Sequence, residues 1–197
     1  MEVKLAKSKK IEDFELINKA CAGNNAAFDQ LMEKYFPLCY RFARKYGLSP
    51  EDSADVLQDT FIAAYKALDR YNPNYKFSTW ILTILLNRLS NKRRALRRAR
   101  RYFMPAENGN VEENVRSKMH VSTPEDSLEN TELQRHINRA IQKLPQKLKS
   151  VFILFEIEQF KIREIAEISG IPAGTVTSRL HTARLHLRAQ LQEFFNA

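Results

Sequence analysis

The stretch KIREIAEISGIPAGTVTSRLHTARLHL, residues 161–187, decides the fold of the C-terminal half of the chain. Residues 161–168 carry isoleucine and alanine at helical spacing and predict a short helix. The sequence Ser-Gly-Ile-Pro at 169–172 predicts a tight turn, and a long helix is expected from Ala173 onward. A short helix, a tight turn and a long helix form a helix-turn-helix, whose second helix enters the major groove of DNA.

The long helix has two chemically different faces. An apolar stripe is expected to face inward and comprises Val176, Leu180, Ala183 and Leu187. The other face carries Thr177, Ser178, His181, Thr182 and Arg184. Short hydrogen-bonding groups and a guanidinium read base edges and hold phosphates, so this face is a candidate DNA-reading surface that ends before Leu185. The alternative is the solvated polar face of an ordinary helix.

The rest of the sequence predicts an all-α protein. Glycine is scarce, with 5 residues in 197, and apolar residues recur every three or four positions. In the N-terminal half we expect a helix at 25–46 that ends at Gly47, and a second that runs to about Leu68 after the N-cap Ser49. A third helix is expected after an N-cap at Ser78.

Helical periodicity is lost in the middle of the chain, where a proline, a glycine and three asparagines appear. We therefore predict two small helical modules, residues 11–101 and 123–197, joined by a flexible linker at 102–122. Residues 1–10 form an N-terminal tail. The second module opens with a helix that is capped at Thr123, and it contains the helix-turn-helix.

The positive charge of the chain is local. The sequence holds 32 basic and 23 acidic residues, for a net charge of +9. Eight of the basic residues and no acidic residue lie between Arg88 and Arg101, so the remaining residues sum to only +1. Cations clustered on a helix gain affinity for nucleic acid by releasing counterions from phosphates. A merely solvated or membrane-seeking helix is the alternative interpretation.

Aromatic side chains are interleaved with polar residues just before that basic helix. They are Tyr71, Tyr75, Phe77 and Trp80. An unpaired base that stacks on a ring gains roughly 1 to 3 kcal/mol, so this loop is a candidate site for single-stranded DNA. Trp80 by itself is better explained as a core residue that supports the loop.

The helix after Ser49 carries an acidic strip, which we define as Asp52, Asp55, Gln58 and Asp59. Asp55 and Asp59 are four residues apart, and such a like-charge pair costs a few tenths of a kcal/mol, on the order of 0.2 to 0.5. A surface shaped for stability would avoid this pair. The strip therefore indicates a positively charged protein partner, with a solvated face as the alternative.

No arrangement of residues predicts catalysis, a cofactor or a metal site. The four histidines are scattered, none has zinc-ligand spacing with a cysteine, and no glycine-rich phosphate loop occurs. A nuclease that used Glu112 and Glu113 would have to place its metal on the linker, which is a poor support for a metal. We therefore expect a protein that is not an enzyme.

The sequence predicts a cytoplasmic protein. Cys21 and Cys39 lie in apolar-periodic segments, as expected for reduced thiols that fill a core. The longest apolar run, residues 80–86, is far shorter than the roughly 20 residues that a membrane span needs. No long apolar stretch follows the lysines of the first ten residues, so neither a signal peptide nor membrane insertion is expected.

Three stretches carry a resemblance to a known family: SADVLQDTF at 53–61, FSTWI at 77–81 and IAEISGIPAGTV at 165–176. In this order, and separated by an irregular linker, they make the chain resemble the extracytoplasmic function (ECF) group of the sigma-70 family over residues 11–194. The resemblance implies sigma region 2 in the first module and sigma region 4 in the second. It also implies that the linker threads toward the RNA exit path of the polymerase.

The resemblance further implies three contact surfaces. Core RNA polymerase, at its β′ clamp helices, would be bound by Asp52, Asp55, Gln58 and Asp59. The −10 promoter element would be bound by Tyr71, Asn72, Asn74, Tyr75, Lys76, Phe77, Ser78, Trp80, Asn87, Arg88, Lys92 and Arg93. The −35 element would be bound by Lys161, Thr175, Thr177, Ser178, Arg179, His181, Thr182 and Arg184. The polymerase β flap and an anti-sigma factor would be further partners.

The chain departs from the group at a few positions. Thr177 and Thr182 stand where arginine is frequent, and Gln159 occupies a turn where glycine is common, so the promoter sequence stays open. The predicted function is that of a sigma factor that binds core RNA polymerase and directs promoter recognition, DNA melting and transcription initiation. The alternative is a stand-alone helix-turn-helix repressor or activator, which would need a dimer to read two half-sites and would leave the aromatic loop and acidic strip without a role.

Overall fold

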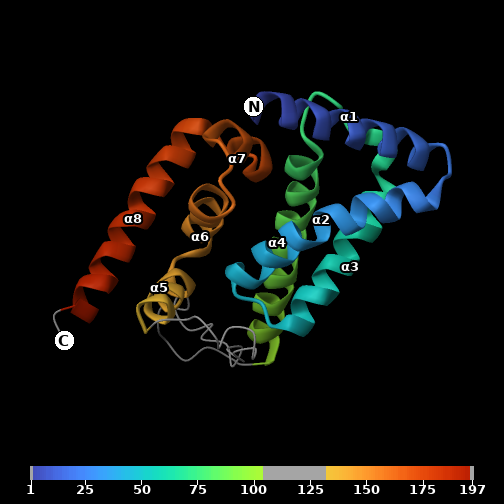
Figure 1. The fold of residues 1–197 in the computed structure, drawn as a ribbon. Helices are drawn as coiled ribbons and strands as arrows, with labels where there is room; N and C mark the ends of the chain where they lie inside the picture. Colours follow the sequence, from blue (N-terminus) through green and yellow to red (C-terminus); the bar gives the residue numbers. More distant parts are fainter. Residues whose placement is uncertain (1, 104–131, 196–197) are drawn as a thin grey trace.

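The computed structural model describes residues 2–103 and 132–195, and within these ranges it contains helices and no strand (Figure 1). The first module consists of α1 (Glu2–Cys21), α2 (Asn25–Tyr46), α3 (Pro50–Lys66), the 3-10 turn η1 (Leu68–Arg70) and α4 (Phe77–Phe103). The second module consists of α5 (Glu132–Lys143), α6 (Gln146–Phe152), the π-helical turn η3 (Ile153–Ile157), α7 (Ile162–Ser169) and α8 (Ala173–Phe195). The predicted all-α class is confirmed.

Local capping signals set the ends of α2 and α3. Gly47 ends α2 in the left-handed conformation with a φ of 111°, which a residue with a Cβ adopts only under strain. Two residues later, the Ser49 hydroxyl accepts a hydrogen bond of 3.0 Å from the Asp52 backbone N–H, and Pro50 occupies the first turn of α3. Both predicted boundaries are therefore confirmed.

The predicted inward faces form the core of both modules. In the first module, Leu57, Phe61, Ala64 and Leu68 are buried against Phe42, Ile81, Leu82 and Leu85. In the second module, Val176, Leu180, Ala183 and Leu187 are buried, as the apolar stripe of the long helix predicted. The helix-turn-helix is present as α7, a turn at Gly170 with a φ of 63°, and α8.

Several local expectations are corrected. The helix after the aromatic loop begins at Phe77, because the Lys76 carbonyl accepts from the N–H groups of Thr79 and Trp80, so Ser78 is not its N-cap. Cys21 is exposed and fills no core, whereas Cys39 is buried as expected.

The observed ends of α1 and α4 differ from the expected module boundaries. Residues 2–10, which we expected as a tail, are part of α1, and residues 102–103 of the expected linker still belong to α4. The rest of the linker, with Glu112 and Glu113, and the expected cap at Thr123 lie outside the described residues.

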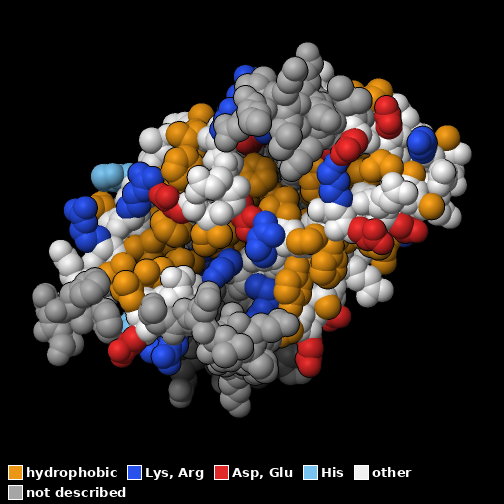
Figure 2. Space-filling model, in the orientation of Figure 1, with side chains coloured by type: hydrophobic (Ala, Val, Ile, Leu, Met, Phe, Trp, Pro, Cys, Tyr) orange, Lys and Arg blue, Asp and Glu red, His pale blue; other side chains and the backbone are white. Residues whose placement is uncertain are grey.

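The two modules pack against each other. Helix α4 lies against α7, and α2 contacts α5 and η3 (Figure 1). Arg41 Nη2 lies 2.9 Å from Glu158 Oε2, and the Gln142 side-chain amide donates to the Lys45 carbonyl over 2.9 Å. On the face shown in Figure 2, Lys and Arg side chains gather near the middle, where the C-terminal part of α2 lies beside the second module. This contact buries Glu158, whose side chain is only 3% exposed.

Candidate nucleic-acid interface

The aromatic loop, residues 71–76, connects η1 to α4 and is shaped by its own hydrogen bonds. The Tyr71 hydroxyl donates to the Tyr75 carbonyl over 2.6 Å. The Asn74 backbone N–H donates to the Asn72 side chain over 2.9 Å, and the Tyr75 N–H donates to the Asn72 carbonyl over 3.1 Å. Residues 72–76 are exposed. The loop therefore presents polar groups and one ring in a fixed turn.

An aromatic floor, which we define as Tyr35, Tyr71, Phe77 and Trp80, lies beneath this loop. The Phe77 ring centroid lies 5.0 Å from that of Tyr35, 5.7 Å from Tyr71 and 5.3 Å from Trp80. Tyr71 and Trp80 lie 5.4 Å apart in an edge-to-face arrangement. Such ring pairs stabilise one another by about 0.5 to 1.5 kcal/mol beyond their burial.

Burial separates the predicted aromatic residues into two groups. Phe77 is 1% exposed, so its ring offers no face to a base in this conformation. Trp80 and Tyr71 are half-buried in the floor, as the sequence suggested for Trp80. Tyr75 is 44% exposed and is the ring of the loop that a base can reach.

The polar residues predicted for this interface are distributed along α4. Ser78 is half-buried, whereas Asn87 and Arg88 are exposed. Lys92 Nζ lies 2.5 Å from Asp52 Oδ1 and so ties α4 to α3. The side chain of Arg93 lies outside the described residues.

The acidic strip on α3 is divided by the same ion pair. The hydrogen bond from Lys92 lowers the pKa of Asp52, against the opposing effect of burial and with help from Ser49. Asp55, Gln58 and Asp59 are exposed, and neither aspartate pairs with another described residue. Three of the four predicted residues therefore remain available to a partner, and Asp52 joins two helices.

An apolar groove of about 470 Å³ lies beside the strip, between α2 and α3. It is lined by Phe28, Asp29, Met32, Phe36, Ala54, Gln58, Phe61, Ile62, Tyr65 and Lys66. Phe36, Ile62 and Tyr65 are each more than two-fifths exposed. Sequence reasoning missed this groove, although Ile62 and Tyr65 follow the acidic strip at helical spacing and break the polar face of α3.

The candidate DNA-reading surface of the helix-turn-helix is mostly exposed. Thr177, Ser178, His181, Thr182 and Arg184 of α8 are exposed, as is Lys161 before α7, while Thr175 and Arg179 are half-buried. The hydroxyls of Thr177 and Thr182 donate to backbone carbonyls one turn earlier, over 3.2 and 3.0 Å. Each hydroxyl still has lone pairs that could accept from a base.

Arg184 has partners that the sequence did not reveal. Its Nη2 and Nε lie 2.6 and 3.0 Å from Glu156 Oε1, and its Cζ lies 5.6 Å from the Phe155 ring centroid. Both partners belong to η3, and Glu156 is 28 residues away from Arg184 in the sequence. The pair holds the guanidinium at the surface of the second module.

Within the described part of the chain, no helix is long and apolar enough to cross a membrane. The same residues contain no group of three or more His, Cys, Asp or Glu side chains that could hold a metal ion.

Two family models match the two modules. Sigma-70 region 2 matches residues 31–102, and sigma-70 region 4 matches residues 134–187. The chain is 33% identical to the ECF RNA polymerase sigma factor SigW of Bacillus subtilis, over 90% of this chain and 95% of that protein. It is 31% identical to the ECF RNA polymerase sigma-E factor of Haemophilus influenzae, over 94% of this chain and 98% of that protein.

Solved structures show the same fold. The structure of CnrH in complex with the cytosolic domain of CnrY matches with a TM-score of 0.67 and 27% identity, over 92% of this chain and 98% of that one. The sigma factor RpoE of Bartonella quintana, solved with the anti-sigma factor NepR, matches with a TM-score of 0.66 and 23% identity, over 84% of this chain and 96% of that one, and supports the fold alone.

These two modules define a promoter-recognition subunit of RNA polymerase. The chain belongs to the ECF group of the sigma-70 family. As a sigma factor it binds core RNA polymerase and promoter DNA and directs transcription initiation. Sigma factors are non-catalytic DNA-binding regulators.

Proposed function

We propose that the aromatic loop, residues 71–76, captures an unpaired base of the −10 element and so promotes strand opening. The observation that carries this proposal is the exposure of Tyr75, which is 44%, above a floor of packed rings. Stacking on such a ring offsets part of the cost of unpairing a base. A turn fixed by its own hydrogen bonds loses little entropy when the base arrives.

The exposed part of the acidic strip, Asp55, Gln58 and Asp59, is our proposed contact with the β′ clamp helices of core polymerase. Two exposed carboxylates four residues apart give a positively charged partner helix two complementary points of contact. We do not include Asp52 in this proposed contact, because its carboxylate is paired with Lys92.

For the −35 element, the proposed reading surface is the exposed face of α8. His181 can donate or accept hydrogen bonds at base edges in the major groove, and the Ser178 hydroxyl, which donates to the Thr175 carbonyl over 3.1 Å, can accept there. Arg179 and Arg184 carry charge along the same helix and are proposed to contact the backbone phosphates.

Two further parts of the proposal concern partners and location. CnrH and the Bartonella sigma factor were each solved with a second protein, and that of the latter is an anti-sigma factor. An anti-sigma protein and the polymerase β flap are proposed partners of this chain too.

Because position and strand opening are binding tasks, we propose that the chain itself is not an enzyme, needs no cofactor and acts in the cytoplasm beside the polymerase.

The loop proposal is tested with holoenzymes that carry wild-type protein, Tyr75→Ala or Phe14→Ala. Phe14 is a matched control because it is an aromatic residue of α1 with 48% exposure and no proposed contact. We expect Tyr75→Ala to lower the permanganate reactivity of −10 thymines about tenfold on duplex DNA, in line with the loss of one stacked base. On a pre-melted bubble template, most of the strand opening that Tyr75→Ala loses on duplex DNA should be restored. An equal loss on both templates, or no loss, would contradict the role of the loop.

A further inference from the structure

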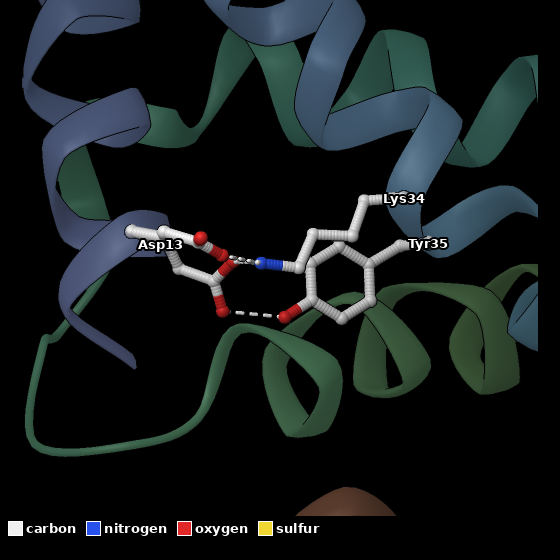
Figure 3. Close-up of polar contacts among 4 residues, drawn as sticks. Asp13, Lys34 and Tyr35 are labelled. Atoms are coloured by element: carbon white, nitrogen blue, oxygen red, sulfur yellow. Dashed lines mark hydrogen bonds and ion pairs between the residues drawn. The ribbon is translucent and has the colours of Figure 1, made fainter. Parts of the chain in front are cut away.

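A carboxylate outside the proposed contact surfaces is buried where α1 crosses α2. Asp13 is 6% exposed. The Tyr35 hydroxyl donates to its Oδ2 over 2.5 Å, and Lys34 Nζ lies 2.8 Å from its Oδ1 (Figure 3). A buried charge is costly unless it is paired and hydrogen-bonded, and Asp13 has both kinds of partner. No sequence pattern predicts this cluster, because Asp13 and Tyr35 are 22 residues apart.

The hydrogen bond from Tyr35 connects Asp13 to the aromatic floor. The Tyr35 ring contacts Phe77 with a centroid distance of 5.0 Å, and Phe77 in turn contacts Tyr71 at 5.7 Å. Tyr71 then donates its hydroxyl to the carbonyl of Tyr75. A continuous series of contacts therefore runs from α1, through the floor, to the backbone of Tyr75, whose ring is exposed.

Both tyrosines of this series have raised pKa values. Burial raises the pKa of Tyr35, and the hydrogen bond to Asp13 raises it further. Burial also raises the pKa of Tyr71 to about 12, with a contribution from the charge of Asp13. A phenol is a hydrogen-bond donor at neutral pH, as the contacts with Asp13 and Tyr75 require, and the raised pKa values extend this to more alkaline pH.

We propose that Asp13 is a positioning residue for promoter opening, which fixes the Tyr35 ring and through it the floor that supports the aromatic loop. This inference rests on the proposed role of that loop. Lys34 is not assigned this role, because it binds the other carboxylate oxygen, Oδ1, and also pairs with Glu12 over 3.1 Å, whereas Tyr35 belongs to the floor. If Asp13 only pinned α1 to α2, its loss would affect folding without any dependence on the state of the template.

The experiment compares open-complex formation by holoenzymes on duplex and pre-melted bubble templates. Tyr35→Phe removes only the hydroxyl, Asp13→Ala removes the acceptor, and Asp13→Asn keeps an oxygen that can accept from Tyr35. Glu12→Gln is the matched control, since Glu12 also pairs with Lys34 but lies outside the floor. Core affinity and thermal unfolding of each variant are measured alongside.

We expect Asp13→Ala to lower opening on duplex DNA about tenfold, the size of effect expected for a lost hydrogen bond to a charged group. Tyr35→Phe should change opening in the same direction, Asp13→Asn should keep most of it, and Glu12→Gln should leave it unchanged. The bubble template should restore Asp13→Ala and Tyr35→Phe, and core affinity should stay at the wild-type value. If Asp13→Ala fails to fold, Tyr35→Phe carries the test.

Two results would overturn the inference: equal losses on duplex and bubble templates, or wild-type opening by Tyr35→Phe. Tyr75→Ala, measured in parallel, separates this failure from failure of the loop proposal. A duplex-specific defect for Tyr75→Ala with none for Tyr35→Phe would reject the role of Asp13 alone. The absence of a duplex-specific defect in Tyr75→Ala would reject the proposed role of the loop.

Discussion

Lys76 Nζ lies 2.7 Å from Glu164 Oε1, so an ion pair joins the last residue of the aromatic loop to the first helix of the helix-turn-helix. Burial by itself would raise the pKa of Glu164, but the ion pair with Lys76 and a hydrogen bond from the Lys161 backbone N–H outweigh it and lower the pKa. The carboxylate of Glu164, in the second module, is thus paired with the ammonium group of Lys76, which we propose to contact −10 DNA. On the proposed assignment of Lys76 to −10 DNA, this carboxylate and a DNA phosphate would compete for the same cation.

This competition predicts that Glu164→Gln strengthens the binding of the free protein to a single-stranded oligonucleotide. An ion pair at the surface contributes about 0 to 1 kcal/mol, and Glu164 is partly buried, so we expect a gain at the upper end of this range, about two- to fivefold. Glu167→Gln is the control, because it changes the net charge equally but Glu167 pairs with Arg163 on the same helix. Fluorescence anisotropy at low salt measures both. If both variants gained affinity equally, the gain would come from the change in net charge and not from the release of Lys76.

Charge reversal tests the acidic strip. Asp55→Arg combined with Asp59→Arg should abolish association with core polymerase and leave helical content intact, because repulsion replaces attraction at two contacts and can cost several kcal/mol, on the order of 3 to 5. Co-purification with core polymerase and circular dichroism are the measurements. Asp69→Arg, an exposed aspartate of η1 outside the strip, is the control. Wild-type co-purification of the double variant would show that the strip is only a solvated face.

Substitutions on α8 should distinguish residues that read bases from residues that bind phosphates. Ser178→Ala or His181→Ala should cost about 1 to 3 kcal/mol at particular −35 positions and relax the preference there. Arg179→Ala should instead weaken all promoters similarly and flatten the dependence on salt. A promoter-library selection at two salt concentrations with each holoenzyme distinguishes the two patterns. Uniform weakening by His181→Ala with an unchanged preference would mean that α8 is rotated in its groove.

The pair Asp52–Lys92 predicts a pH dependence of stability. Because the pKa of Asp52 is lowered in the folded state, the pair contributes stability that is full above the ordinary value of 3.8 and is lost as the pH falls through the lower folded value. The difference in thermal unfolding between wild-type protein and Asp52→Asn should therefore be full at pH 7, begin to shrink below about pH 3.8 and disappear below the folded-state pKa of Asp52. Glu164 titrates in both proteins and cancels in this difference. A gap that persists at acidic pH would contradict the assignment.

Much of the fold was predictable because the signals that define it are local. Gly47 and Ser49 set two helix boundaries through contacts within a few residues, and the stripe at Val176 and Leu180 identified the buried face of α8. The resemblance to the ECF group, and not local reasoning, implied that glycine is common at the position of Gln159. Gln159 does adopt a φ of 57°, a conformation that glycine takes at little cost.

The remaining features depend on residues that are distant in sequence. The burial of Phe77 depends on Tyr35 as well as on its own neighbours, and Arg184 is held by Glu156 of another element. Likewise, the packing of the modules depends on pairs such as Lys76 with Glu164. No periodicity encodes these contacts, since each requires two helices to be placed first. For the same reason the sequence could list the loop aromatics but could not tell that only Tyr75 is well exposed.

Run-off transcription is the most direct test of the central claim, that this chain gives core RNA polymerase promoter recognition and strand opening. Core polymerase, the purified protein and both together are each incubated with a genomic promoter library, and the 5′ ends of the transcripts are mapped. We expect transcripts from discrete start sites only when both components are present, and weak binding of duplex DNA by the protein alone. Tight binding at discrete sites by the protein alone, with no new transcripts when core is added, would contradict it and favour a stand-alone helix-turn-helix regulator.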